Sequence, residues 1–194
     1  LCRTLEPGGG ESLWVGTRGG GIGRLKGGRW THYREAQGLK NLSVFCFRET
    51  RRADGRRWLW AGTFGGGAVR LPLDDPHATQ WETFDAETLP GLPSNVVVRI
   101  EVDPKGRLYF ATQRGVARVT FQNPLTPSRP EKVQTFTTGD GLSSVACNYG
   151  ASIIDHAVLV WVSTHLGSAV LDQALELPPP YLHNLILDND LQHA

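Results

Sequence analysis

Methionine is absent from this sequence of 194 residues, and cysteine occurs only at Cys2, Cys46 and Cys147. An odd number of widely spaced cysteines gives neither a disulfide framework nor the paired spacing of a zinc site. We therefore expect buried thiols, although two of the three could pair in an oxidising compartment. Because the chain opens at Leu1 without an initiator methionine, we also expect it to be a piece of a longer protein.

Long apolar runs are lacking too. No stretch approaches the roughly 18 apolar residues of a membrane-spanning helix, and no basic start with an apolar run and a cleavage site is visible. The net charge is only +1, and the basic residues are spread along the chain, so nothing indicates a nucleic-acid partner. What the chain has in abundance is 23 glycines, with 12 prolines and 6 tryptophans, a composition typical of short strands and tight turns.

A short strand-like segment recurs along the chain. It is LWVGT at 13–17, LWAGT at 59–63, a weaker YFAT at 109–112 and WVST at 161–164. The four closing threonines are spaced by 46, 49 and 52 residues. Strand-rich units with periods of roughly 40 to 50 residues are typical of β-propeller blades.

The rest of each unit repeats as well. Glycine runs at 19–23 and 65–67 follow the first two cores, an aromatic strand follows at 30–33, 81–84 and 133–136, and a Gly-Leu turn closes the unit at 38–39, 91–92 and 141–142. With the β-branched run at 96–102, each unit holds four strand candidates. The sequence predicts an all-β fold, a β-propeller fragment of about four four-stranded antiparallel blades with the last one incomplete. The approximate units are 1–37, 38–90, 91–140 and 141–177.

These units resemble the two-component regulator propeller repeat, whose pattern runs Asp-x-x-Gly-x-Leu-Trp-x-Gly-Thr, a Gly-Gly turn, an aromatic strand and a Gly-Leu-x-x-Asn turn. Residues 91–96 (GLPSNV) match the last turn, and 141–144 (GLSS) begin it again. The resemblance covers nearly all of 1–187. The fourth unit departs from it, with Ser163 in place of glycine, no glycine run and no clear aromatic fourth strand. The segment PPPYLHNL at 178–185 resembles the start of the β-sandwich domain that follows such propellers, so 178–194 is expected to begin that domain or a C-terminal extension.

The resemblance implies a ligand-sensing input module of a two-component-type signalling protein, in the periplasm or otherwise extracytoplasmic. Glycan-derived ligands are implied, with an oligosaccharide as the expected small-molecule partner and no cofactor. A membrane would be reached only through segments outside this chain. Four blades are too few for a closed ring, so we expect the remainder of a propeller, or a second copy, to cover the open blade faces.

Ligand contacts are expected in the loops that follow the repeated threonine, because blade loops at one end of a propeller meet near its axis. The residues at these positions are Arg18, Phe64, Gln113, Arg114 and His165. This prediction rests on position alone. The glycine runs are interpreted as turns between strands, since a phosphate-binding loop would have to open a helix.

No catalytic or metal-binding residues are predicted, because the histidines lack ligand spacing and the carboxylates are scattered over turns. Two other function classes stay open: a propeller lyase acting on a glycan or cyclic peptide, which needs a His or carboxylate constellation on one face, and a protein-binding scaffold, although the signatures of WD repeats are absent.

Two further features stand apart from the repeat. The densest basic cluster, interpreted as a solvated hairpin with an acidic-sugar contact as the alternative, comprises Arg48, Arg51, Arg52, Arg56 and Arg57. Among the tryptophans, Trp14, Trp60 and Trp161 occupy equivalent strand positions and predict packing between blades, whereas Trp58 has no counterpart.

Overall fold

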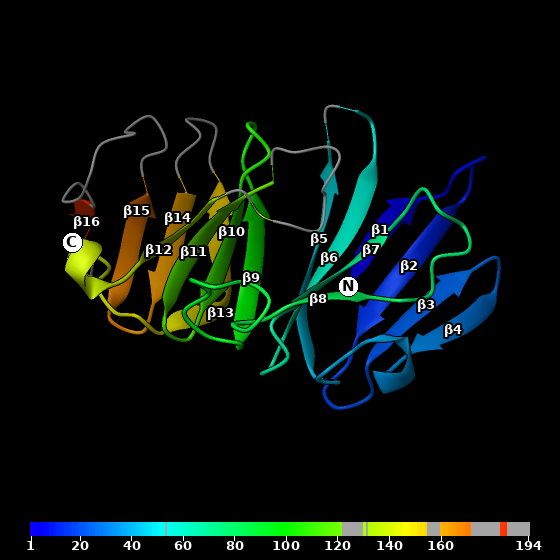
Figure 1. Cartoon of the computed structure of the whole chain (residues 1–194), viewed down its shortest axis with the longest axis horizontal. Coiled ribbons are helices and arrows are strands. Elements are labelled where there is room, and N and C mark those ends of the chain that lie inside the picture. Colours follow the sequence, from blue (N-terminus) through cyan, green and yellow to red (C-terminus); the bar gives the residue numbers. More distant parts are fainter. Residues whose placement is uncertain (53, 122–129, 131, 155–159, 172–182, 186–194) are drawn as a thin grey trace, which may run out of the picture.

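The computed structural model describes residues 1–52, 54–121, 130, 132–154, 160–171 and 183–185, and it arranges their strands in four antiparallel sheets of four strands each (Figure 1). The first sheet holds β1 (Cys2–Leu5), β2 (Glu11–Gly16), β3 (Ile22–Lys26) and β4 (Arg29–Tyr33). The second holds β5 (Val44–Arg51), β6 (Arg57–Thr63), β7 (Ala68–Pro72) and β8 (Glu82–Phe84). The third holds β9 (Val97–Val102), β10 (Leu108–Thr112), β11 (Gly115–Thr120) and β12 (Lys132–Phe136). The fourth holds β13 (Cys147–Ile154), β14 (Val160–Thr164), β15 (Gly167–Leu171) and β16 (His183–Leu185).

The predicted fold class is confirmed, with one correction in the last blade. A fourth strand, β16, pairs with β15 through Ala169 and Asn184, so this blade has four strands rather than an incomplete set. The sequence assigned this segment to the start of a following domain, because His183–Leu185 lacks the aromatic pattern of the other outer strands. Only these three residues of 178–194 are described, and the division into domains there stays a prediction. No helix of the described residues is long and apolar enough to cross a membrane.

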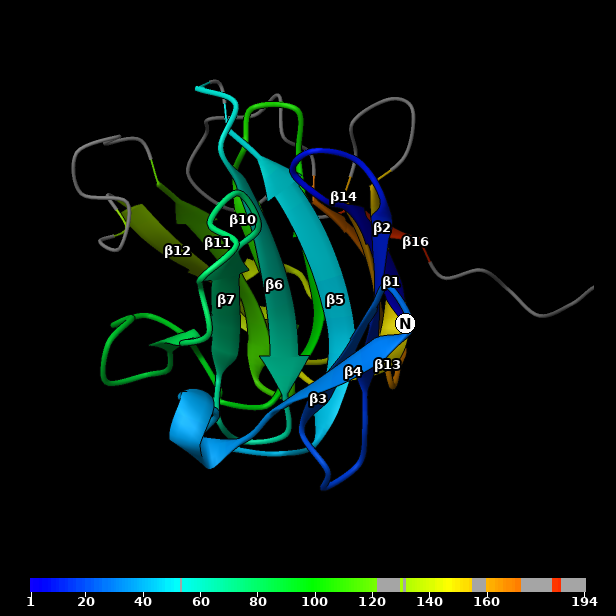
Figure 2. The ribbon, with the colours of Figure 1, turned by 90° about the vertical axis from the view of Figure 1, so that its right-hand side faces the viewer.

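The first strands of successive sheets lie next to one another, β5 beside β9 and β9 beside β13. Figure 2 shows β5, β6 and β7 side by side, with the strands of the first sheet nearer the viewer. The first strand of each blade therefore lies innermost, and the later strands follow outward in chain order, as in a propeller.

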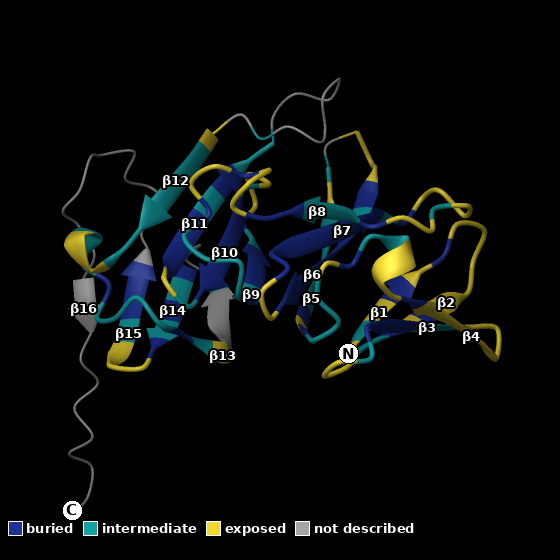
Figure 3. Cartoon of the chain, turned by 60° about the horizontal axis from the view of Figure 1, so that its bottom comes forward, coloured by how far each residue is buried: buried dark blue, intermediate teal, exposed yellow. Residues whose placement is uncertain are grey.

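Aromatic side chains on the second strand of one sheet pack against the next sheet. Trp14 is fully buried with Leu59 and Ala61 of the second sheet, and Trp60 lies in one cluster with Leu108 and Phe110 of the third. The buried residues thus concentrate on the strands at which one sheet packs against the next (Figure 3). The packing predicted for Trp14 and Trp60 is confirmed, whereas Trp161 is only half-buried.

The repeated glycine is explained by the close approach of the next blade. A Cβ added at Gly16 would lie 2.8 Å from Val44 Cγ1, and one at Gly62 would lie 2.6 Å from the carbonyl oxygen of Val97. Val44 and Val97 both begin the first strand of the following sheet. Any larger residue would push two blades apart.

The repeated threonine closes the turn after its own strand. In each of the four sheets, the threonine hydroxyl donates a hydrogen bond to the carbonyl oxygen of a glycine three or four residues later in the chain. The pairs are Thr17 with Gly21, Thr63 with Gly67, Thr112 with Gly115 and Thr164 with Gly167, at 2.7–2.9 Å. The threonine is therefore a structural residue of the turn.

The glycine runs join one blade to the next, which confirms their interpretation as turns. The N–H groups of Gly65 and Gly67 both donate to the carbonyl of Asn95, at 3.1 and 2.8 Å. In the first sheet, Gly19 and Gly21 donate in the same way to Leu42, at 3.2 and 2.9 Å. These N–H groups are therefore occupied by protein acceptors and do not form a phosphate cradle.

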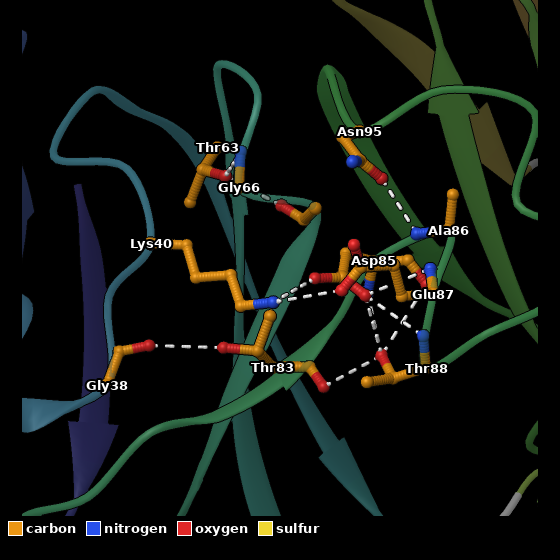
Figure 4. A network of polar contacts seen from close by, with 11 residues as sticks. Gly38, Lys40, Thr63, Gly66, Thr83, Asp85, Ala86, Glu87, Thr88 and Asn95 are labelled. Carbon is orange, nitrogen blue, oxygen red and sulfur yellow. Dashed lines mark hydrogen bonds and ion pairs between the residues drawn. The ribbon is translucent and has the colours of Figure 1, made fainter.

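A polar network fixes the Gly-Leu turn against the outer strand of the second sheet (Figure 4). Thr83 of β8 donates to the carbonyl of Gly38 at 3.1 Å, and the ammonium group of Lys40 lies 2.6 Å from a carboxylate oxygen of Asp85. Burial alone would raise the pKa of Asp85, but its hydrogen bonds with Lys40 and Thr88 outweigh this effect and hold the pKa at about 2. The turn between two blades is thereby tied to the second of them.

The three cysteines are free thiols, so the alternative that two of them pair is not realised. Cys46 and Cys147 are buried in the cores, and Cys2 is half-buried. Burial raises the pKa of Cys46 to about 12 and that of Cys147 to about 11. These two thiols are therefore poor nucleophiles at neutral pH.

Candidate functional site

A pocket of about 640 Å³ opens where residues from all four sheets and their loops come together. Its walls combine loop residues after β2 and β6 with the beginnings of the innermost strands β5, β9 and β13. The lining residues are Gly16, Thr17, Arg18, Ser43, Val44, Phe45, Phe64, Val98 and Tyr149. A concave site of this size falls within the range of small-molecule pockets.

Three aromatic rings form one exposed cluster in this pocket. The ring of Phe45 lies 5.6 Å from that of Phe64, edge to face, and 5.0 Å from that of Tyr149. All three side chains remain substantially exposed, with Phe45 at 38%, Phe64 at 44% and Tyr149 at 54%. Grouped exposed aromatic rings leave apolar surface in water, and such surface marks binding sites.

Irregularities at the start of the innermost strands shape this pocket. The pairing of β5 with β6 shifts between Val44 and Cys46, which leaves Phe45 as the extra residue of a bulge. The pairing of β9 with β10 shifts in the same way at Val98, and β13 is irregular between Cys147 and Ser152, the stretch that contains Tyr149. Bulges re-aim side chains at the rims of β-structures, and here three of them supply lining residues.

Polar groups complete the pocket. The amide of Gln113 donates to the hydroxyl of Tyr149 at 3.2 Å and connects the third sheet with the fourth. Arg18 brings a guanidinium group to the wall, and Thr17 and Ser43 are close by in the lining. The pocket can therefore offer both ring faces and hydrogen-bonding groups to one ligand.

The five residues predicted from position divide into two groups. Arg18 and Phe64 line the pocket, and Gln113 bonds to a lining residue. Arg114 and His165 do not line it; their backbone N–H groups bond to Thr112 Oγ1 and to the carbonyl of Ala146, at 3.1 Å each. A ligand-binding role for any of the five stays a prediction.

Sequence reasoning missed Phe45 and Tyr149. Both lie on innermost strands, and only the bulges direct their side chains into the pocket. The signal available in the sequence was an aromatic residue near the start of the first strand of a blade. Phe45 is the second residue of β5, and Tyr149 is the third residue of β13. Within the described residues, no group of three or more His, Cys, Asp or Glu side chains is placed to hold a metal ion.

The basic hairpin is more organised than expected. Arg57 is buried and forms an ion pair with Asp74 at 2.9 Å, and Arg48 pairs with Glu101 at 3.2 Å. Arg56 pairs with Asp54 at 2.8 Å on the surface. The interpretation as a fully solvated hairpin is therefore wrong for Arg57, whose charge the fold itself uses.

Comparison with known proteins finds one family model that matches part of this chain. Residues 91–114 match the sequence model of the two component regulator propeller. This segment contains the Gly-Leu turn and strands β9 and β10, and the structure repeats the same unit in four sheets. The match covers 24 of the 194 residues, and it shows that this part of the chain is similar to the two component regulator propeller. Among curated proteins, no sequence matches it.

Several solved structures share the fold of this chain. Two are extracellular domains of putative hybrid two component systems from B. thetaiotaomicron. One is 23% identical with a TM-score of 0.58 over 89% of this chain, and the other is 17% identical with a TM-score of 0.65 over 96%. A third is PorZ, a surface component of the type-IX secretion system of Porphyromonas gingivalis, 16% identical with a TM-score of 0.59 over 95% of the chain. The chain spans only 20%, 25% and 28% of these three proteins, respectively.

Proposed function

We propose that this propeller is a ligand-sensing input module of a two-component-type signalling protein, and that its pocket binds a glycan-derived ligand. The observation that carries the proposal is the exposed cluster of Phe45, Phe64 and Tyr149 where the four sheets meet. The family match at 91–114 and the extracellular domains of putative two component systems among the similar structures agree with a sensory role.

The chemistry of the pocket suits a sugar. Aromatic faces pack against the C–H faces of a pyranose ring, as apolar surface with specific geometry. The hydroxyl, amide and guanidinium groups of Ser43, Gln113 and Arg18 are suited to bonding the hydroxyls of such a ring. A ligand held between residues of several blades would alter how the blades pack, which gives binding a route to a conformational signal.

A lyase is less well supported than a binding module. General acid–base chemistry needs a histidine, a carboxylate or a comparable group within reach of the substrate. The described residues that line the pocket include no histidine and no carboxylate. No observation favours a protein-binding scaffold over a sensor.

The location and the larger assembly belong to the same proposal. We place the module outside the cytoplasm, as are the two extracellular domains of similar fold. The face of the first sheet that carries Leu5, Leu13 and Trp30 is exposed. We propose that another blade covers it, contributed by the rest of a propeller or by a second copy.

Thermal unfolding with a panel of neutral and acidic oligosaccharides tests the sensor proposal. A ligand at 100 times its dissociation constant adds about 2.7 kcal/mol of stability and raises the midpoint. The variant Phe45→Ala should lose this shift. Trp30→Ala is the matched control, since Trp30 is similarly exposed, at 48%, but lies outside the pocket. A cooperative transition that no glycan moves would overturn the proposal.

A further inference from the structure

A second cleft lies between the second and third sheets, at the end of β5 opposite the aromatic pocket. It has a volume of about 770 Å³ and is lined by the β5–β6 and β9–β10 hairpins and by side chains between the sheets. Figure 1 shows these two hairpins at the same edge of the molecule. The lining includes Arg51, Arg52, Trp58, Arg70, Lys105 and Phe121.

Positive charge dominates this cleft. Its described lining has four cationic side chains, those of Arg51, Arg52, Arg70 and Lys105, against the single carboxylate of Asp54. That carboxylate lies 2.8 Å from Arg56 and 3.9 Å from Arg52. An anion entering the cleft would therefore meet a surplus of positive charge.

Two of these cations are not neutralised by the fold. Neither Arg51 nor Lys105 forms an ion pair with any residue that the structure describes, and both are exposed. They come from different blades, Arg51 from the end of β5 and Lys105 from the turn between β9 and β10. One ligand group between the blades could bind both.

Arg70 adds a buried charge to the same cleft. Its guanidinium carbon lies 4.2 Å above the ring of Trp58 and 4.8 Å from that of Phe84, and the residue is 2% exposed. Glu82 pairs with it at 2.8 Å, yet the desolvation of Arg70 still lowers its pKa. A further negative charge nearby would compensate this desolvated cation.

The indole N–H of Trp58 points to the same kind of ligand. It is buried and has no acceptor among the described residues, although Trp58 lines the cleft. By contrast, Trp14 and Trp60, which are equivalent to each other in the repeat, both have acceptors: Trp14 donates to Thr4 at 2.9 Å and Trp60 to Thr50 at 3.2 Å. A buried donor without an acceptor is costly, and an oxygen of a bound anion would satisfy it.

We infer that this cleft is a second binding site, for a small organic ligand that carries a carboxylate or sulfate group on a ring-sized body. The oxyanion binds between Arg51, Arg52 and Lys105 and accepts a hydrogen bond from the indole N–H of Trp58. The rings of Trp58 and Phe121 contact the body of the ligand. Guanidinium groups suit this task because their N–H groups bind carboxylates bidentately. The site is separate from the pocket of Phe45, Phe64 and Tyr149.

Isothermal titration calorimetry on the full chain tests this site. The probes are trigalacturonate, a sulfated disaccharide, a neutral trisaccharide and sodium sulfate. In the Phe45→Ala variant of the full chain, whose aromatic pocket is disabled, we expect binding of the first two that weakens with added salt, and none of the neutral sugar. Comparing the two acidic probes decides between a carboxylate and a sulfate group. Tight binding of the neutral sugar at this cleft would overturn the inference, as would equal binding of inorganic sulfate, which has no organic body.

Charge variants in the β5–β6 and β9–β10 hairpins localise the binding. Arg51→Gln and Lys105→Gln should each weaken acidic-probe binding about 10-fold, since hydrogen bonds between charged groups have about that worth. Arg56→Gln is the matched control. It removes a positive charge from the hairpin that also carries Arg51, but Arg56 does not line the cleft, so the affinity of this variant for the acidic probes should change little. An equal loss in Arg56→Gln would show nonspecific attraction and contradict the site.

A pair of tryptophan variants tests the orphan donor. Trp58→Phe keeps a ring but removes the N–H, and should weaken acidic-probe binding several-fold. Trp81→Phe is the matched control, because its indole N–H is likewise buried without an acceptor among the described residues, and Trp81 does not line the cleft. Equal effects of the two variants would contradict the proposed contact. Phe45→Ala should leave acidic-probe binding intact, which separates this site from the sensor pocket.

Discussion

Trp30 in the outer strand of the first sheet and Trp81, which directly precedes the outer strand of the second, occupy equivalent positions in the repeat, yet their surroundings differ. Trp81 is 4% exposed and packs edge-on against Trp14 at 6.0 Å and Tyr33 at 5.9 Å, both in the first sheet. Trp30 is 48% exposed, and its ring contact is with His32, at 6.4 Å. The same residue is core or surface according to whether a preceding blade lies against it.

The contrast extends along the whole face of each sheet. Leu59 of the second sheet is fully buried against the first, whereas its counterpart Leu13 is 37% exposed. Leu71 is 1% exposed, while its counterpart Leu25 is only half-buried. A blade face is therefore built to be covered, and its apolar side chains become stabilising only when a neighbour arrives.

The largest expected effect comes from emptying a covered face. Trp60→Ala removes a buried ring from between the second and third sheets, and should lower the free energy of unfolding by about 3–5 kcal/mol. Trp30→Ala on the open face should change it by no more than about 0.5 kcal/mol. Urea unfolding of both variants measures the difference. A large loss in Trp30→Ala would show that this face is already covered in solution, for example by a second copy.

Added methyl groups provide a second comparison. Gly62→Ala places a Cβ 2.6 Å from the carbonyl oxygen of Val97 in the next blade, and should destabilise the fold by about 1–3 kcal/mol. For Gly23→Ala on the open sheet, the nearest atom to the added Cβ belongs to the ring of Trp30, at 3.1 Å, and this ring is exposed and can move aside. Its effect should be clearly smaller. Equal losses by thermal unfolding would contradict this account of the blade junction.

Acid should weaken both sheets through their buried carboxylates. The pKa of Asp85 in the second sheet is about 2, and so is that of Glu6 in the first, where burial is outweighed by hydrogen bonds from Lys26, Ser12 and Arg24. Both values lie below those of the unfolded chain, so the stabilisation is complete above about pH 5 and disappears as pH falls toward 2.

The variant Asp85→Asn isolates the contribution of the second sheet. It should cost about 1–2 kcal/mol at pH 7 and flatten the fall in stability between pH 5 and pH 2. Unfolding midpoints measured across this range check the expectation. A variant whose pH profile matches that of the unaltered protein would show that the contact between Lys40 and Asp85 contributes nothing.

The smallest expected effect concerns the turn threonines. Thr63 is fully buried and Thr17 is exposed, although both donate to a glycine carbonyl. Thr63→Val should cost about 1–1.5 kcal/mol and Thr17→Val about 0.5 kcal/mol, because water can replace the lost donor only at the exposed turn. Denaturant titration can resolve the two values, and a reversed order would contradict the argument.

Periodicity made much of this fold predictable. The spacing of Thr17, Thr63 and Thr112 gave the blades, and the glycines between strands gave the turns, because each repeat must solve the same packing problem. The pocket was only half predictable. Arg18 and Phe64 follow from their place after the threonine, but Phe45 and Tyr149 depend on bulges, and strand register is a tertiary property that a single sequence does not display.

The second cleft shows the same limit. The basic hairpin was visible as a run of arginines, but the sequence did not reveal which of them the fold would neutralise. The structure pairs Arg48 and Arg57 with carboxylates and leaves Arg51 without an ion pair among the described residues. Trp58 has no counterpart in the repeat, and it was the feature of the sequence that set this hairpin apart from the others.

The bonds from Gly65 and Gly67 to the carbonyl of Asn95 involve main-chain atoms alone, and Gly19 and Gly21 repeat them at Leu42. Because these bonds between blades do not depend on particular side chains, a gene segment that encodes one blade can be duplicated without changes in the neighbouring blades. Loops can then diverge to suit new ligands while the array continues to assemble. In this architecture, the growth of the protein and the evolution of its specificity are separable.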